Sequence, residues 1–213
     1  MLFMCAIIFM KIFNKYYCEV KMKHKDVLLY RIIRPIITIL FKVLYTPKYE
    51  GLENILLNDG VVLAGNHTSI MDAVFLMSST KRNIHFLAKA ELWHGLKKIL
   101  FANLGLIPVN RNNHDHQALV DADAYLNNNL VVGIFPEGTT EKVKGQIMPF
   151  KVGAVKMAKD TNSKLVPFVI KGNYKLFSKE LKIEFLKPLI IKDDIDKERA
   201  RLYNIIKNKM EES

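Results

Sequence analysis

The sequence predicts an α/β fold in which a mixed, largely parallel sheet is flanked by helices. After Pro47, short apolar runs alternate with amphipathic stretches at helical spacing, a pattern typical of strands alternating with helices. The run Leu130–Phe135 is apolar throughout, as expected of a central strand buried on both faces. Polar clusters also follow several of the predicted strands, where open α/β sheets collect their functional sites.

The individual elements follow from this alternation. The apolar runs predict strands at Val61–Ala64, His85–Ala88, Leu106–Val109, Leu130–Phe135, Leu165–Ile170 and Leu181–Leu186. The amphipathic stretches predict helices at Met71–Met77, Glu91–Ala102, His116–Asn127, Gly153–Lys159 and Ile195–Met210.

Two apolar stretches precede this domain, so the chain divides into an N-terminal helical segment, residues 1–46, and an α/β domain, residues 47–213. Met1–Phe13 is too short to span a bilayer, which needs about 20 apolar residues. Val27–Tyr45 has apolar residues at three- and four-residue steps and is interrupted by Arg31, Arg34 and Lys42. Each charge costs roughly 2.5–3.5 kcal/mol at a bilayer centre, which disfavours a spanning helix. Two alternatives remain for this helix: the membrane interface or the domain's own core.

The formal net charge of +11, from 32 Lys and Arg against 21 Asp and Glu, indicates an anionic partner. Composition alone leaves nucleic acid, an anionic membrane and phosphorylated substrates open. The first 50 residues hold nine Lys or Arg and three Asp or Glu. Cys5 and Cys18 are remote from any Cys/His cluster, so neither a disulfide framework nor a structural metal site is predicted.

The cluster from Gly65 to Asp72 follows the first predicted strand of the domain and contains a possible His–carboxylate pair. Histidine is the natural general base near neutral pH, and a carboxylate on its ring fixes the tautomer. Five residues of continuous helix turn about 500°, which would separate the two side chains. His67 and Asp72 therefore meet only if His67 lies in the turn before the helix and Asp72 on its first turns.

Three further clusters also follow or lie within predicted strands. Gly105–Arg111 ends with an arginine whose planar fork suits a phosphate. In Phe135–Thr140, Gly138 permits a tight turn and Glu137 is a candidate acceptor from substrate hydroxyls. Val166–Pro167 places a proline in a strand, which usually marks an edge or a bulge. The sequence has no Gly-x-Ser-x-Gly elbow, P-loop, Gly-x-Gly-x-x-Gly or His-Glu-x-x-His motif.

Taken together and in this order, the four clusters resemble the glycerolipid acyltransferase family, which includes the 1-acylglycerol-3-phosphate acyltransferases. The family carries Asn-His-x-x-x-x-Asp, Gly-x-Ile-x-Val-x-Arg, Phe-Pro-Glu-Gly-Thr and a Val-Pro strand, which match Asn66–Asp72, Gly105–Arg111, Phe135–Thr139 and Val166–Pro167. The resemblance spans roughly residues 27–190 and includes the segments Ala88–Leu92 and Phe150–Ala154.

The resemblance implies an acyltransferase that moves a fatty acyl group from acyl-CoA or acyl carrier protein to the hydroxyl of 1-acylglycerol-3-phosphate. His67 and Asp72 would be catalytic, with His67 as the base. Substrate-binding roles fall to Asn66, Lys89, Arg111, Glu137, Gly138 and Thr139, and neither cofactor nor metal is implied. The resemblance also implies a helical membrane-docking element before the domain, which favours the interfacial alternative for Val27–Tyr45. A peripheral protein on the cytoplasmic face of a bacterial cell membrane is the corresponding expectation.

One residue departs from the family pattern, which usually continues Glu-Gly-Thr-Arg. Thr140 replaces that arginine, which in relatives helps to hold the acceptor's phosphate. Lys142 or Lys144 are possible substitutes, as are Lys89 and Arg111. The departure keeps open a different acceptor or a transacylase. A non-catalytic membrane-binding protein and a basic nucleic-acid-binding domain are the alternatives of other classes, and no recognised nucleic-acid motif supports the latter.

Overall fold

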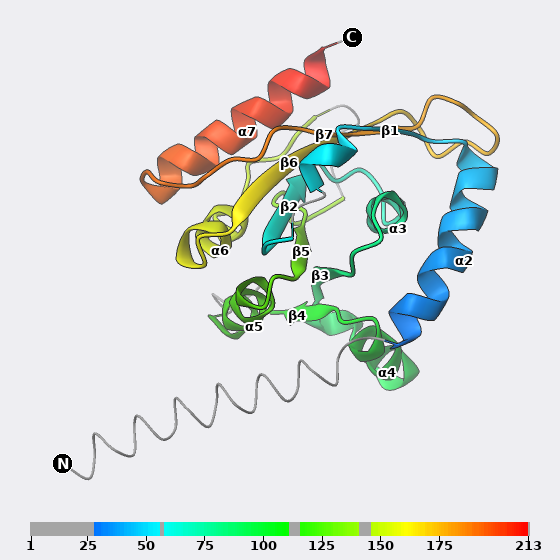
Figure 1. The fold of residues 1–213 in the computed structure, drawn as a ribbon, viewed down its shortest axis with the longest axis horizontal. Helices are drawn as coiled ribbons and strands as arrows, with labels where there is room; N and C mark the ends of the chain where they lie inside the picture. Colours follow the sequence, from blue (N-terminus) through cyan, green and yellow to red (C-terminus); the bar gives the residue numbers. More distant parts are fainter. Residues whose placement is uncertain (1–27, 56–57, 111–115, 141–145, 213) are drawn as a thin grey trace.

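A computed structural model describes residues 28–55, 58–110, 116–140 and 146–212 of the chain. Within these residues, seven strands form one sheet in the order β1-β7-β6-β2-β5-β3-β4 (Figure 1). The strands are β1 Lys48–Glu50, β2 Val61–Gly65, β3 Ile84–Lys89, β4 Ile107–Val109, β5 Val131–Ile134, β6 Lys164–Lys171 and β7 Lys182–Phe185. The helices are α2 Leu28–Tyr45, α3 Met71–Ser79, α4 Gly95–Asn103, α5 His116–Asn127, α6 Gly153–Asp160 and α7 Ile195–Glu211.

The sheet is mixed but largely parallel, which confirms the predicted fold class. Strand β2 lies between β5 and β6 and is parallel to both, and β3 and β4 continue the parallel arrangement. Strand β7 runs antiparallel to β6, and β1 joins it in parallel at the sheet edge. Five parallel strands therefore end at the same edge of the sheet.

Each face of the sheet is covered by its own set of helices. Side chains of α5, α6 and α7 pack on one face around Val62 and Ala64 of β2. Side chains of α2 and α3 pack on the other face around Val61 and Leu63. Figure 1 shows α5, α6 and α7 on one side of the strands and α3 and α2 on the other. The alternation of β2 side chains between two apolar layers explains why the strand is hydrophobic at every position.

Two details differ from the sequence-based expectations. The stretch predicted as one helix, Glu91–Ala102, begins as a 3₁₀ turn, Ala90–Leu92, and becomes α-helical only at Gly95. His94 is extended and Gly95 has a φ of +53°, so the backbone between the two pieces is not helical. Strand β1 was not predicted, because three residues are too few for a period-two pattern to be read.

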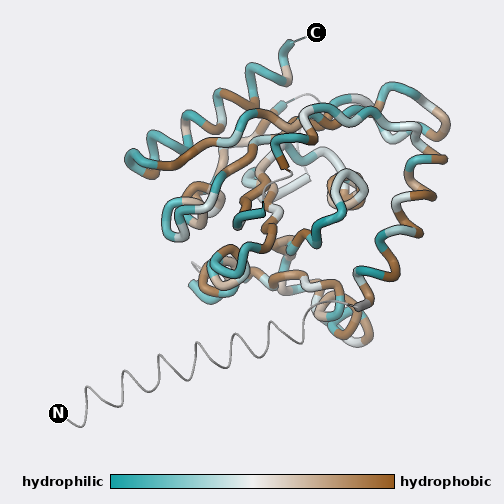
Figure 2. Tube along the Cα trace, in the orientation of Figure 1, coloured by the Kyte–Doolittle hydropathy of each residue, from teal (hydrophilic) through white to brown (hydrophobic). Residues whose placement is uncertain are grey.

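Helix α2 packs one side on the domain and exposes an apolar face on the other, and its location at a membrane interface stays a prediction. Tyr30 and Phe41 are buried against the domain. The exposed apolar side chains of α2 are Ile32, Ile36, Ile39, Leu40 and Val43, each more than half exposed. Apolar and polar residues alternate along this helix (Figure 2). No helix among the described residues has the length and hydropathy needed to cross a membrane. The predicted domain boundary at residues 46 and 47 stays a prediction.

Candidate active site

The strand ends place two of the predicted motifs side by side. Ala64 of β2 is paired in register with Ile134 of β5, and the two strands are parallel. The chain therefore leaves β2 at Asn66–His67 and leaves β5 at Phe135–Glu137 on the same edge of the sheet. Contacts follow directly from this arrangement: the His67 ring stacks on the Phe135 ring, with centroids 4.0 Å apart and planes 11° apart.

His67 and Asp72 form the predicted pair. His67 lies in the loop before α3, and Asp72 is the second residue of that helix. The two side chains meet with 2.9 Å between His67 Nδ1 and Asp72 Oδ2. Within the residues that the structure describes, Nδ1 is the ring nitrogen with a hydrogen-bonding partner, and the His67 side chain is 18% exposed. This arrangement leaves Nε2 as the nitrogen that can receive a proton from a bound hydroxyl.

Asp72 is completely buried and is surrounded by donors. Besides His67, its Oδ2 accepts the backbone N–H groups of Thr68 at 2.6 Å and Ser69 at 2.9 Å. Its Oδ1 accepts the hydroxyl of Tyr174 at 2.5 Å. Burial raises the pKa of the Asp72 carboxyl, but the hydrogen bonds from His67, Tyr174, Ser69 and Thr68 outweigh it, so the pKa lies below its usual range. Asp72 is therefore held as a carboxylate beside the histidine.

The Glu137 carboxylate is buried and accepts hydrogen bonds from two backbone N–H groups. One oxygen accepts the N–H of His67 at 2.7 Å, and the other accepts the N–H of Met148 at 2.8 Å. The carboxylate thus joins the loop after β2 to the segment that precedes α6. These two contacts differ from the predicted one with a substrate hydroxyl, which stays a prediction.

Asn66 is also buried, and its amide pairs with backbone. Its Nδ2 donates to Ile170 O at 2.9 Å, and its Oδ1 accepts Ile170 N–H at 2.8 Å. This two-point contact fixes the end of β2 to the end of β6, immediately before His67. We therefore interpret Asn66 as a residue that positions His67, and its predicted contact with substrate stays a prediction.

Gly138 and Thr139 lie in the turn after Glu137. Gly138 has a φ of +71°, a left-handed conformation that favours glycine, and its N–H donates to Phe135 O at 3.0 Å. The Lys151 side chain lies against this turn, since a β-carbon at Gly138 would be 3.3 Å from Lys151 Nζ. An exposed cation therefore borders the loop that carries Glu137. Thr139 is half-buried beside it, and Thr140 is exposed.

The remaining predicted cations are more distant or fall outside the described residues. Lys89 is the exposed last residue of β3, on the same sheet edge but two strands away from β2. With strands about 4.8 Å apart, its Cα lies roughly 10 Å from the end of β2. Arg111, Lys142 and Lys144 lie outside the described residues.

Sequence reasoning missed two neighbours of the site, Tyr174 and Lys151. Lys151 falls in the Phe150–Ala154 segment that the family resemblance includes, which is a signal for it. Tyr174 follows β6 in a loop without any motif, and it is 102 residues from Asp72 in the chain. Only the three-dimensional fold brings this hydroxyl to the carboxylate.

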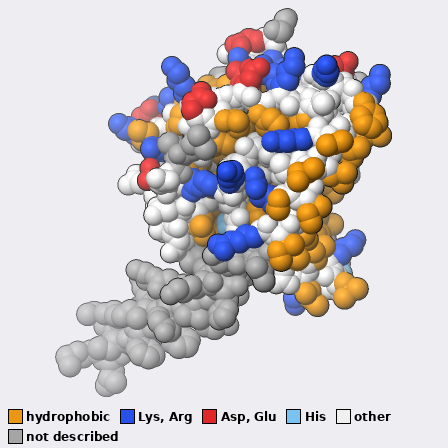
Figure 3. Space-filling view, turned by 45° about the vertical axis from the view of Figure 1, so that its right-hand side comes forward, with side chains coloured by type: hydrophobic (Ala, Val, Ile, Leu, Met, Phe, Trp, Pro, Cys, Tyr) orange, Lys and Arg blue, Asp and Glu red, His pale blue; other side chains and the backbone are white. Residues whose placement is uncertain are grey.

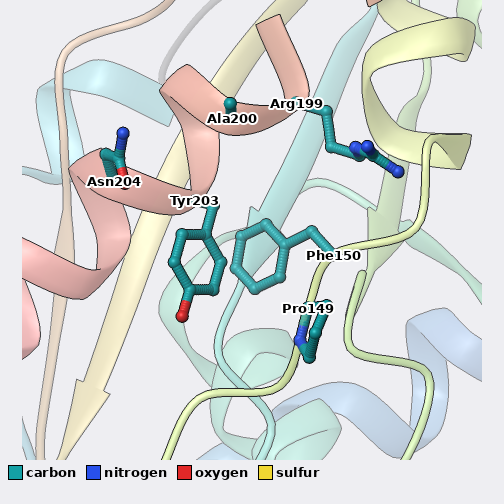
Figure 4. A pocket seen from close by; sticks show the side chains of 6 residues that line it. All are labelled: Pro149, Phe150, Arg199, Ala200, Tyr203 and Asn204. Carbon is teal, nitrogen blue, oxygen red and sulfur yellow. The ribbon is translucent and has the colours of Figure 1, made fainter. Parts of the chain in front are cut away.

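A separate pocket lies between α7 and the segment before α6 (Figure 4). Its lining residues are Pro149, Phe150, Arg199, Ala200, Tyr203 and Asn204. The rings of Phe150 and Tyr203 meet edge to face, with centroids 5.3 Å apart. The pocket shares no residue with the His67–Asp72 site, so we place the candidate chemistry at the sheet edge and not here.

A buried carboxylate that orients a partly exposed histidine is typical of enzymes that use histidine as a base. The chain belongs to the acyltransferase family, whose model, described as Acyltransferase, matches residues 46–171.

Individual relatives carry more specific names. The chain is 31% identical over 138 residues to a 1-acyl-sn-glycerol-3-phosphate acyltransferase of Borreliella burgdorferi, covering 62% of this chain and 53% of that protein. It is 33% identical over 132 residues to the enzyme of that name in Bacillus subtilis, covering 59% and 62%. The chain thus spans between half and two thirds of the length of these relatives.

Among solved structures, the fold resembles the crystal structure of the 1-acyl-sn-glycerophosphate (LPA) acyltransferase PlsC from Thermotoga maritima. The TM-score is 0.70 at 20% sequence identity, covering 92% of this chain and 88% of that one. This similarity supports the fold.

Proposed function

We propose that the protein transfers a fatty acyl group from an acyl thioester to the free hydroxyl of 1-acylglycerol-3-phosphate, giving phosphatidic acid. The observation that carries the proposal is the His67–Asp72 pair, 2.9 Å apart, in a chain that belongs to the acyltransferase family. A protein that only binds membranes needs no ionised carboxylate held against a histidine ring.

The reaction begins when Nε2 of His67 takes the proton of the acceptor hydroxyl as its oxygen attacks the thioester carbonyl. The buried Asp72 carboxylate stabilises the imidazolium that forms. Collapse of the tetrahedral intermediate breaks the carbon–sulfur bond, and the imidazolium returns the proton to the departing thiolate. The thiol belongs to coenzyme A or to acyl carrier protein. Every atom and proton in this sequence is accounted for by the donor, the acceptor and His67.

Cations near the site favour an acceptor with a phosphate. Lys151 borders the Gly138 turn, and Lys89 ends β3 on the same sheet edge. Arg111 is a further candidate on the basis of its motif. We propose that these residues replace the arginine that relatives carry where this chain has Thr140.

The apolar face of α2 is proposed to dock on an anionic membrane, where the lysophospholipid and the product reside. Figure 3 shows hydrophobic side chains and Lys and Arg side chains gathered next to each other on this side of the molecule. An apolar face with flanking cations suits the interface of an anionic bilayer. We accordingly propose a peripheral association with the cytoplasmic face of a bacterial cell membrane.

The function is tested by mass spectrometry of lipid products. Purified protein receives acyl-CoA or acyl carrier protein thioester with a panel of lyso-lipids in anionic vesicles. The proposal predicts thioester-dependent phosphatidic acid from 1-acylglycerol-3-phosphate, and none from His67→Ala. Acylated product without thioester would indicate a transacylase, and preference for another lyso-lipid would overturn the acceptor. Absence of any acylated product would favour a non-catalytic membrane protein.

Docking is tested by vesicle sedimentation with a matched control. The double variant Ile36→Ser with Ile39→Ser removes two side chains that are 62% and 65% exposed, and should weaken binding about tenfold or more. Val120, 48% exposed on α5, lies on the helix layer of the opposite sheet face, so Val120→Ser should leave binding unchanged. Equal binding by both variants would exclude α2 as the docking surface.

A further inference from the structure

The loop between β6 and β7 brings Tyr174 against the buried carboxylate of the site. The Tyr174 hydroxyl lies 2.5 Å from Asp72 Oδ1, the oxygen that His67 does not contact. Burial, and then the charge of Asp72, raise the pKa of Tyr174, so the phenol stays protonated and donates. The groups facing this phenol are Asp72 from α3 and Tyr45 from α2. Tyr174 thus donates to the oxygen that His67 does not contact, where the other side-chain donor is the Thr68 hydroxyl at 3.3 Å.

The loop that carries Tyr174 is held at both ends. At its start, Asn66 pairs with Ile170 of β6, and Gly172 has a φ of +90° with Glu180 O close against it. A β-carbon at Gly172 would lie 2.3 Å from that oxygen, so the two ends of the loop approach this closely only because position 172 is a glycine. The position of the Tyr174 hydroxyl is therefore set by the sheet that also positions His67.

The same loop packs against helix α2. The Tyr174 ring makes edge contacts with Tyr45 at 5.8 Å and Phe41 at 6.3 Å between ring centroids. Phe41 in turn stacks on Phe75, which lies three residues beyond Asp72 on α3. Further along, the N–H of Phe177 donates to Leu44 O at 2.6 Å. A ring cluster therefore joins the proposed docking helix to the carboxylate.

We propose that Tyr174 is a positioning residue that fixes Asp72 for the His67 base and ties this alignment to the seating of helix α2. This inference rests on the proposed acyltransferase function. Among the residues that the structure describes, the other hydrogen-bonding partners of the Asp72 carboxylate are the His67 ring and the backbone and hydroxyl groups of Thr68 and Ser69. Those partners all belong to residues 67–69, so Tyr174 is the partner that ties the carboxylate itself to a distant part of the domain.

The test compares Tyr174→Phe with Tyr49→Phe, using 1-acylglycerol-3-phosphate in anionic vesicles and an acyl thioester. Tyr174→Phe keeps the ring and its packing and loses only the hydroxyl. Tyr49→Phe is a matched control, because the Tyr49 hydroxyl bonds Ser78 Oγ at 2.8 Å on the same helix but does not reach Asp72. The expected result is a kcat about tenfold lower for Tyr174→Phe, with KM within twofold, and no change beyond twofold for Tyr49→Phe.

The pH profile separates positioning from a general loss of stability. Without the phenol's hydrogen bond, more negative charge stays on the Asp72 carboxylate, which then stabilises the protonated His67 ring more strongly. The acid limb of the kcat/KM profile should therefore move to higher pH in Tyr174→Phe. Replacement by 3-fluorotyrosine, a stronger donor of similar size, should move the limb to lower pH. These opposite shifts would not arise from a purely structural role.

The outcomes distinguish this inference from the proposed function. If His67→Ala is inactive but Tyr174→Phe has wild-type kcat and an unmoved acid limb, the role of Tyr174 is overturned and the function stands. If His67→Ala keeps wild-type turnover, both are overturned. A loss of kcat in Tyr49→Phe equal to that in Tyr174→Phe would also overturn the specific role of Tyr174.

Discussion

The segments that follow β2 and β5 each contain a buried acid, Asp72 at the start of α3 and Glu137 in a loop, and the two acids hold different parts of the same histidine. Asp72 contacts the His67 ring through Nδ1, whereas Glu137 accepts the His67 backbone N–H. Asp72 also accepts backbone N–H groups from Thr68 and Ser69 in the loop before α3, whereas Glu137 accepts the N–H of the more distant Met148. One carboxylate thus acts on the protonation of the ring and the other on the placement of the chain.

This contrast adds a role that the sequence motifs did not give. Both acids stand in short motifs that follow strands, and the sequence placed Asp72 beside His67 but assigned Glu137 to a substrate hydroxyl. The hydrogen-bonding partners of the two acids distinguish their roles. The buried Glu137 carboxylate accepts two backbone N–H groups, so it already holds two loop segments together. We therefore expect variants at the two positions to fail in different ways.

Replacement of Asp72 by asparagine should have the largest effect. The new amide side chain would keep the volume but remove the charge that stabilises the imidazolium and disturb the ring tautomer. We expect kcat to fall roughly 10³–10⁴-fold, measured by product formation under saturating substrate. Thermal unfolding should be followed in parallel as a control for folding. A kcat within tenfold of wild type in a folded Asp72→Asn protein would contradict the ionised role of Asp72.

Replacement of Glu137 by glutamine should mainly reduce stability. Its amide nitrogen would have to face either the His67 or the Met148 N–H, leaving a buried donor opposite a donor, at a cost of about 1–3 kcal/mol in the free energy of unfolding. We expect a lower Tm and a kcat loss of about tenfold, smaller than for Asp72→Asn. Glu53→Gln, at an exposed glutamate, should change neither quantity. An unchanged Tm with a 10³-fold loss of kcat would instead assign Glu137 to the chemistry.

A third acid, Asp123 on α5, shows what happens when burial is not offset by donors. Its Oδ1 is buried without a hydrogen-bonding partner among the described residues. Burial, and then the charge of Asp160, raise its pKa from 3.8 to about 6, the reverse of the shift at Asp72. The folded protein therefore binds this proton more tightly than the unfolded chain, and stability falls as the pH rises from about 4 to 6.

The effect of Asp123→Asn should be the smallest and should depend on pH. The variant removes the ionisation that costs stability above the raised pKa. We expect its Tm to exceed that of wild type by a few degrees at pH 7.5 and to approach it at pH 4.5. The same difference in Tm at both pH values would contradict unfavourable burial of the ionised form.

The sequence predicted the fold class, because the alternation of strands and helices is a local pattern. For His67 and Asp72, the five-residue step set only the condition under which they meet, and the four ordered motifs of the family resemblance favoured their pairing. Strand β7 was predicted at Leu181–Leu186, but its antiparallel direction was not assigned, because strand direction within a sheet leaves no local signal. The partners of Asn66 and Glu137, and the contact of Tyr174, were also not predicted, because they join residues 11 to 104 positions apart.

Pro167 illustrates how context overrides a local rule. Proline was expected to mark an edge or a bulge, but β6 is an interior strand, with Pro167 paired to Ala64 of β2. Pro167 O accepts Leu186 N–H on the side of β7, and β7 ends at Phe185. The missing proline N–H therefore lies just past the end of β7, so it interrupts none of the β6–β7 pairs from Phe168 to Lys171.

His67 and Asp72 should act as one unit in acyl transfer, and every role proposed for the neighbouring residues depends on this. A double-mutant cycle on kcat with His67→Ala, Asp72→Asn and the double variant measures their coupling. Residues that act as a unit are strongly non-additive, so the double variant should be no more than about threefold slower than His67→Ala alone. A double variant whose loss equals the product of the two single losses would show that the two residues act independently, which would contradict a catalytic pair.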